Sequence, residues 1–185
     1  MIRMWRWKWR LWWGAGAVLL LMLLRLGVHG TQTSPSAHSA PARPTKVVVG
    51  QLAPTIRTTT MAGGQFNVAT VHRPVMLNFW ASWCTYCKIE APAVARLAAA
   101  ARGHYRVITI DITSNDTLSQ ARAFAQHFHL PHPVLLDPTG AIQAHYLVRV
   151  LPTTYYLNSR GVVVNQVLGA ETYSAMYSHI QKAGG

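Results

Sequence analysis

The chain has 185 residues, 50% of them hydrophobic, which is enough for one folded domain with an added segment and excludes disorder of the whole chain. Its 17 lysine and arginine residues outnumber its 5 aspartate and glutamate residues, for a formal charge of +12. After residue 30 the basic residues form no stripe with interleaved stacking rings, which argues against nucleic acid and favours anionic lipid or wall polymer as a neighbour.

Residues 1–10 alternate basic side chains with tryptophan, a pattern typical of a lipid headgroup boundary. An uncharged apolar run follows at 11–24 and extends to residue 28 if Arg25 snorkels outward. A helix over 11–28 would be about 27 Å long at 1.5 Å per residue, close to the ~30 Å of a hydrocarbon core. We therefore expect residues 1–28 to be a single-pass signal-anchor in the cell membrane, with the rest of the chain on the extracytoplasmic side.

Cleavage of this segment as a signal peptide is the alternative, because the same apolar run also suits a signal-peptide core. No convincing small-residue cleavage site follows it closely, and no cysteine follows that could carry a lipid anchor. Residues 29–46 are rich in threonine, serine, proline and alanine and are expected to form a flexible linker. The folded domain is then expected at 47–185, a normal length for one domain.

The domain is expected to begin with a hairpin whose strands, 55–60 and 65–68, flank two glycines. The apolar run 74–81 has the length of a central strand buried on both faces. A helix from Cys84 to about residue 102 and a buried strand at 106–112 follow, and this order predicts a right-handed parallel crossover. Further elements are expected in this order: a helix at 117–128, a strand at 132–137, a helical turn at 141–146, strands at 153–157 and 162–167, and a helix at 171–182.

The only two cysteines, Cys84 and Cys87, stand at the junction between the central strand and the next helix. The pKa of a thiol falls at a helix N-terminus, which favours Cys84 as the exposed nucleophile. Cys87, one helical turn later, is expected to be the sheltered resolving thiol that releases a mixed disulfide. The alternatives are a structural disulfide and half of a zinc site, which would need two further ligands. Covalent haem attachment would need a histidine at position 88, where Lys88 stands.

Several separated motifs accompany the cysteine pair. They are the runs 77–80 and 79–88, Glu90, Pro92, the run 133–137, the run 150–154 and Asn158-x-x-Gly161. Together they resemble the thioredoxin superfamily and, within it, the membrane-anchored, extracytoplasmic ResA/TlpA-like thiol-disulfide oxidoreductases. The resemblance covers about 47–182.

The resemblance implies an α/β, thioredoxin-like fold: a central mixed sheet flanked by helices, with an N-terminal hairpin extension and a βα insertion. It implies that Pro152 is cis and lies against the cysteine pair, and that Leu151 offers its backbone to a substrate chain. Trp83 is expected at the rim of this substrate-binding site. An ordinary proline at the start of a strand is the alternative for Pro152.

Glu90 follows Cys87 by three residues and so lies on the same side of the helix. The resemblance implies that it is a buried proton partner of the thiols, with a raised pKa; a solvated carboxylate is the alternative. Asn78 stands where cytoplasmic thioredoxins have a buried aspartate. Between the cysteines, Thr85 and Tyr86 replace a dipeptide that often contains proline and that tunes the redox potential, so the direction of electron flow stays open.

These expectations describe an enzyme that reduces disulfides in exported proteins such as apocytochrome c, during cytochrome c maturation. Its electrons would come from a membrane thiol-disulfide carrier, and it would act as a monomer with no metal and no cofactor beyond the Cys84–Cys87 disulfide. The alternatives are an oxidant or isomerase of exported proteins, a redoxin-type peroxidase, and a metallochaperone. The peroxidase motif Pro-x-x-x-Thr-x-x-Cys is missing before Cys84, and His127, His129 and His132 span a helix end and a loop, which does not suit a metal site.

Overall fold

The computed structural model describes residues 45–184. The predicted signal-anchor at 1–28 lies outside these residues, as does all of the predicted linker except its last two positions. Between residues 45 and 184, no helix has both the length and the apolar character needed to cross a membrane.

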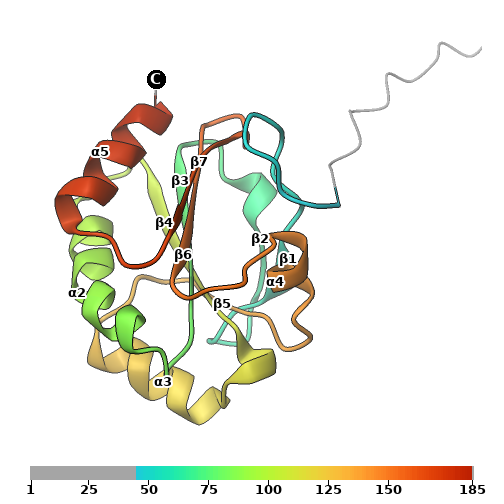
Figure 1. Cartoon of the computed structure of the whole chain (residues 1–185), viewed down its shortest axis with the longest axis vertical. Helices are drawn as coiled ribbons and strands as arrows, with labels where there is room; N and C mark the ends of the chain where they lie inside the picture. Colours follow the sequence, from blue (N-terminus) through green and yellow to red (C-terminus); the bar gives the residue numbers. More distant parts are fainter. Residues whose placement is uncertain (1–44, 185) are drawn as a thin grey trace, which may run out of the picture. The chain divides into compact units, whose positions relative to one another are not determined.

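A five-stranded mixed sheet forms the centre of the domain, in the order β5-β4-β3-β6-β7 (Figure 1). The middle strand, β3 (Val75–Trp80), is parallel to β4 (Arg106–Asp111) and antiparallel to β6 (Thr153–Leu157). At the edges, β5 (Val134–Leu136) is parallel to β4, and β7 (Val163–Leu168) is antiparallel to β6. All six residues of β3 are buried, as the apolar run predicts for a strand covered on both faces.

Successive side chains of β3 point to opposite faces of the sheet and enter two separate cores. Met76 and Trp80 pack with residues of α2 (Thr85–Ala100), α3 (Leu118–His127) and α5 (Tyr173–Gly184). These three helices lie on one side of the sheet in Figure 1.

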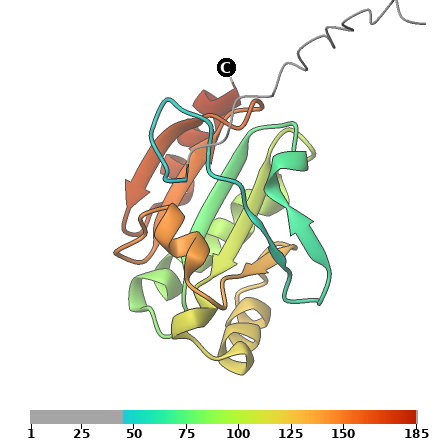
Figure 2. The same ribbon diagram turned by 90° about the vertical axis from the view of Figure 1, so that its right-hand side faces the viewer.

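The other face of the sheet is covered by the N-terminal hairpin and a short helix, as Figures 1 and 2 show from two sides. The hairpin consists of β1 (Arg57–Thr59) and β2 (Gln65–Asn67), which pair antiparallel. The 3₁₀ helix η1 (Val68–Thr70) follows β2. The short helix is α4 (Ala141–His145), and Tyr146, directly after it, packs its ring on Phe79 and Tyr155. This second core holds Val75, Leu77 and Phe79 from β3.

The fold confirms the thioredoxin-like mixed sheet with flanking helices. The expected hairpin precedes the sheet, and β5 and α4 stand between α3 and the loop that carries Pro152, where a βα insertion was expected. One feature was not expected: besides the Leu151–Pro152 bond, the His132–Pro133 bond is also cis.

Candidate active site

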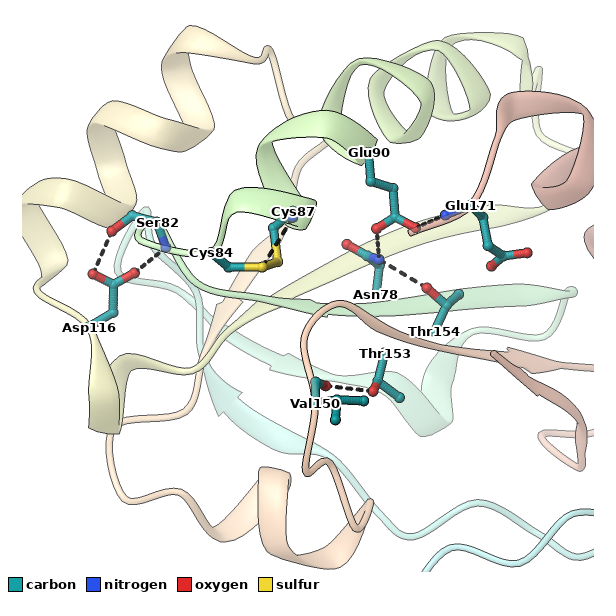
Figure 3. Close-up of a disulfide and its surroundings, with 10 residues drawn as sticks. All are labelled: Asn78, Ser82, Cys84, Cys87, Glu90, Asp116, Val150, Thr153, Thr154 and Glu171. Atoms are coloured by element: carbon teal, nitrogen blue, oxygen red, sulfur yellow. Dashed lines mark hydrogen bonds between the residues drawn. A yellow bond between two sulfur atoms is a disulfide. The ribbon is translucent and has the colours of Figure 1, made fainter. Parts of the chain in front are cut away.

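Cys84 and Cys87 are joined by a disulfide at the start of α2 (Figure 3). Cys84 is the N-cap residue, and its sulfur accepts a hydrogen bond from the Cys87 N–H at 3.1 Å. The first turn of the helix therefore directs a backbone N–H at this sulfur, as expected for a cysteine at a helix N-terminus. Cys84 is only 4% exposed and Cys87 2%, so the exposed fractions of the two residues do not separate an exposed cysteine from a sheltered one, as had been expected.

Cys84 differs from Cys87 in bordering a surface hollow of about 380 Å³. The hollow brings together five of the residues predicted from the sequence: Trp83, Cys84, Thr85, Tyr86 and Leu151. Its other lining residues were not predicted: Ile112, Asn115, Gln143 and Arg149. Two other predicted residues, Glu90 and Pro152, are buried and lie outside this lining.

The loop that leads from β3 to Cys84 is fixed by a carboxylate that sequence reasoning missed. Asp116 accepts hydrogen bonds from the Ser82 N–H at 2.5 Å and from the Ser82 hydroxyl at 2.7 Å (Figure 3). The neighbouring indole of Trp83 donates to the Asn115 carbonyl at 2.7 Å. Asn115 is the last residue of the 3₁₀ helix η2 (Thr113–Asn115), which follows β4. The segment after β4 therefore holds Ser82 and Trp83, the two residues that precede Cys84, in place.

The proline loop has the expected conformation, with a cis bond between Leu151 and Pro152. The Thr153 hydroxyl donates to the Val150 carbonyl at 2.8 Å and closes the loop (Figure 3). Pro152 is buried, and its carbonyl accepts a hydrogen bond from the Gly169 N–H. By contrast, the backbone of Leu151 makes no hydrogen bond to any residue between 45 and 184.

Glu90 is buried with 2% exposure and is not the solvated carboxylate of the alternative interpretation. Its Oε2 accepts from the Asn78 side-chain amide at 2.8 Å, and its Oε1 accepts from the Glu171 N–H at 2.9 Å. The same amide of Asn78 donates to the Thr154 hydroxyl at 3.0 Å (Figure 3). Burial raises the pKa of Glu90 to about 7, although both hydrogen bonds favour the charged form.

A second carboxylate, Glu171, continues this buried network towards the surface. Its side chain accepts from the Tyr156 hydroxyl at 2.8 Å and pairs with His179 Nδ1 at 2.8 Å. The side chain of Glu171 is 4% exposed and that of His179 28%. Burial is also the main cause that raises the pKa of the Tyr156 hydroxyl well above its usual range. None of these three residues was predicted, because no local pattern connects them with the cysteine motif.

Asp111, at the end of β4, is a further buried acid that the sequence did not indicate. It is fully buried, and one of its oxygen atoms accepts from the Thr113 hydroxyl at 2.7 Å. Burial raises its pKa to about 7. The nearby charges of Asp116 and Asp137 act in the same direction.

Within the described part of the chain, no three histidine, cysteine or acidic residues gather in a way that could hold a metal ion. This applies to His127, His129 and His132, all of which are described. His127 instead packs its ring against Phe128.

The chain was compared with protein families, with known proteins and with solved structures. The AhpC/TSA family pattern matches residues 49–166. Thioredoxin-like protein YneN of Bacillus subtilis (strain 168) is 32% identical over 166 residues, which cover 89% of this chain and 94% of that protein. Thiol-disulfide oxidoreductase ResA of Bacillus anthracis is 28% identical over 138 residues, which cover 74% of this chain and 79% of that protein.

Among solved structures, a secreted disulfide oxidoreductase of Mycobacterium tuberculosis, homologous to E. coli DsbE, has a TM-score of 0.63. It is 24% identical, and the match covers 69% of this chain and 95% of that one. This likeness concerns the fold, whereas the family pattern and YneN extend to the sequence around the cysteines. The chain therefore belongs to the AhpC/TSA family and is a thiol-disulfide oxidoreductase with a thioredoxin-like fold.

Proposed function

We propose that this oxidoreductase reduces disulfides in exported proteins on the extracytoplasmic side of the cell membrane. The observation that carries the proposal is that Cys84 and Leu151 line one surface hollow, while the Leu151 backbone has no partner among the described residues. An extended substrate chain can pair with that backbone as a short added strand. Its disulfide would then lie beside Cys84.

In the reduced enzyme, the Cys84 thiolate attacks one sulfur of the substrate disulfide and expels the other as a thiolate. The Cys87 thiol gives its proton to Glu90 and attacks the Cys84 sulfur, which forms the Cys84–Cys87 disulfide and expels the second substrate thiolate. Two electrons pass to the substrate, whose sulfur atoms leave as thiols after protonation. Burial of Glu90 one turn after Cys87, with a pKa of about 7, supports this role.

The enzyme returns to its reduced form by exchange with a membrane thiol-disulfide carrier. Apocytochrome c, which must be reduced before haem attachment, is the client that the resemblance to ResA/TlpA-like proteins suggests. The basic, tryptophan-rich start and apolar run of residues 1–28 support a retained anchor. Within this proposal the enzyme works as a monomer.

Trapping in the native host tests the proposal. The Cys87→Ser variant should accumulate mixed disulfides through Cys84, because the resolving thiol is gone. The Cys84→Ser variant is the matched control and should trap nothing. Capture of exported proteins that contain disulfides supports the proposal, whereas traps formed only through Cys87 would contradict the assigned roles.

The direction of electron flow is tested by the reduction potential of the Cys84–Cys87 pair. A value near about −270 mV, that of thioredoxin, is expected for a reductant, whereas about −120 mV would make the enzyme an oxidant. Rapid reduction of hydroperoxides with little activity on protein disulfides would instead favour the alternative of a redoxin-type peroxidase.

A further inference from the structure

None of the acidic residues of this protein is exposed. The sequence contains 5 of them, and every one lies in the described domain: Glu90, Asp111, Asp116, Asp137 and Glu171. Each accepts at least one hydrogen bond from the protein, and all are buried or half-buried. The described surface therefore carries no exposed carboxylate.

The basic side chains show the opposite distribution. Every arginine and lysine between residues 45 and 184 is exposed except Arg106, which is half-buried. The only ion pair found in that range joins Glu171 to a histidine, so no arginine or lysine there is neutralised by a carboxylate. Such a surface attracts anionic partners and repels cationic ones.

Two of these cations line surface hollows that Trp83, an exposed neighbour of Cys84 in the sequence, also lines. Arg149 lines the hollow that Cys84 borders. Lys88 lines a separate hollow together with Trp83 and His127. Neither Arg149 nor Lys88 has a side-chain hydrogen bond or ion pair with another described residue, so both charges are available to a ligand.

The walls of the Cys84 hollow are also suited to apolar side chains. Trp83 is 52% exposed and Tyr86 64%, and Leu151 and Ile112 add to the apolar lining. Exposed aromatic rings beside an unpaired arginine are typical of protein-recognition surfaces. A lipid headgroup would use the cations but has no need of a hollow that Cys84 borders, so the arrangement favours a protein segment.

We propose that this site selects substrates in which an acidic residue stands within a few positions of the reacting cysteine, next to an aromatic or aliphatic residue. The acidic group pairs with Arg149, with Lys88 available in the second hollow that Trp83 lines, and the apolar residue packs on Trp83 and Tyr86. This inference rests on the proposed function, because it names the substrate class of the same site.

The test uses the full chain in an uncharged detergent and two disulfide peptides that differ only in having aspartate or lysine beside the cysteine. The protein is first reduced and freed of reductant, and the measurement is kcat/KM for each peptide from single-turnover reactions at low and at high salt. We expect the wild type to prefer the aspartate peptide by roughly threefold or more at low salt, with the preference shrinking as salt screens the charges.

Substitutions at Arg149 and Arg160 test whether the preference for the aspartate peptide depends on Arg149. Arg149→Glu should abolish or invert this preference, and Arg149→Gln should weaken it. Arg160→Glu, which changes the net charge as Arg149→Glu does but lies in the turn after β6, should retain the preference. Equal kcat/KM for both peptides in the wild type would overturn the inference. Equal loss in Arg149→Glu and Arg160→Glu would also overturn it, because the whole basic surface would then bind polyanions, anionic lipid included.

Failure of this inference and failure of the proposed function give different results. If the wild type reduces both peptides equally well, only the substrate preference is wrong. If it reduces neither peptide nor any other protein disulfide, the reductase function itself is wrong, and the substrate class proposed here is wrong with it.

Discussion

Glu90 is the ionisable side chain that follows the buried cysteine pair on the same side of α2, one helical turn after Cys87. Hydrogen bonds from Asn78 and from the Glu171 N–H stabilise its charged form. Burial outweighs them, and the pKa of Glu90 rises to about 7. A carboxyl group with this pKa can accept and return a proton near neutral pH, as a thiol exchange reaction requires.

Replacing Glu90 by glutamine should slow the attack of Cys87 on a mixed disulfide by roughly 10²-fold at neutral pH, because the proton acceptor is lost. Stopped-flow measurement of mixed-disulfide resolution checks this. The deficit should shrink at alkaline pH, where the Cys87 thiol ionises without help. A uniform loss at every pH would indicate structural damage rather than loss of a proton partner.

Two buried carboxyls, Glu90 and Asp111, should make the protein less stable as pH rises. Their folded-state pKa values are about 7, above the ordinary values of 4.5 and 3.8. Each therefore holds its proton more tightly when folded, so its contribution to stability is full below the ordinary pKa and is lost as pH rises through about 7. Urea unfolding should give a smaller free energy at pH ~8 than at pH ~5. The decline should be smaller in Glu90→Gln, and an identical decline would contradict the assignment.

At the scale of elements, β3 contributes side chains to two hydrophobic cores, and only one of them contains the cysteine pair. Met76 faces the core that contains Cys84, Cys87 and Trp80. Phe79 faces the other core, where its ring packs on Tyr146 and Tyr155 at centroid distances of 5.3 and 6.0 Å. The strand therefore separates a face that supports the cysteine helix from a face that supports the hairpin and α4.

Truncation of either side chain should destabilise the domain, since both are fully buried. Met76→Ala should cost roughly 2–5 kcal/mol and Phe79→Ala roughly 3–5 kcal/mol of unfolding free energy. Only Met76→Ala should also change the reduction potential of the cysteine pair, because its cavity opens in the core of α2. Denaturant titration and redox titration of the two variants check this, and equal shifts in potential would contradict the division into two cores.

The elements themselves were predictable because their apolar runs have the period of strands or helices. The first and last residues of an element were harder to predict where side-chain hydrogen bonds determine them. The last helix begins at Tyr173 rather than near Glu171, because the Thr172 hydroxyl accepts from the Ala175 N–H and the Glu171 N–H is bound to Glu90. Turn residues give no periodic signal from which such contacts could be read.

The site was predictable where a motif carries it and not where distant residues meet. The cysteine pair followed from the only two cysteines and their place before a helix, whereas the cis bond before Pro152 and the burial of Glu90 followed from the resemblance to a known family. Asp116 lies 34 residues from Ser82, and Glu171 lies 81 residues from Glu90. Only the folded sheet brings these pairs together, so a single sequence could not reveal them.

At the scale of the whole molecule, a basic surface and a proposed anchor could each hold the protein at a membrane. The first mode depends on exposed arginine and lysine side chains and weakens with salt. The second mode depends on the apolar run in residues 1–28 and does not weaken with salt.

Extraction of host membranes should separate the two modes. We expect the full-length chain to stay in the membrane fraction after washes with high salt and with alkaline carbonate, and to enter solution only with detergent. Release by high salt alone would indicate electrostatic attachment. Recovery of a shortened chain from the soluble fraction would indicate that the N-terminal segment is cleaved.

The hydrogen bond from the Glu171 N–H to Glu90 offers a way to follow the ionisation of Glu90 by NMR. It ties one backbone amide, outside the cysteine motif and just before α5, to the carboxyl group one turn after Cys87. The nitrogen and proton resonances of that amide should therefore follow the ionisation of Glu90. A single backbone signal would then report, without any label at the sulfur atoms, when the site takes up and releases its proton.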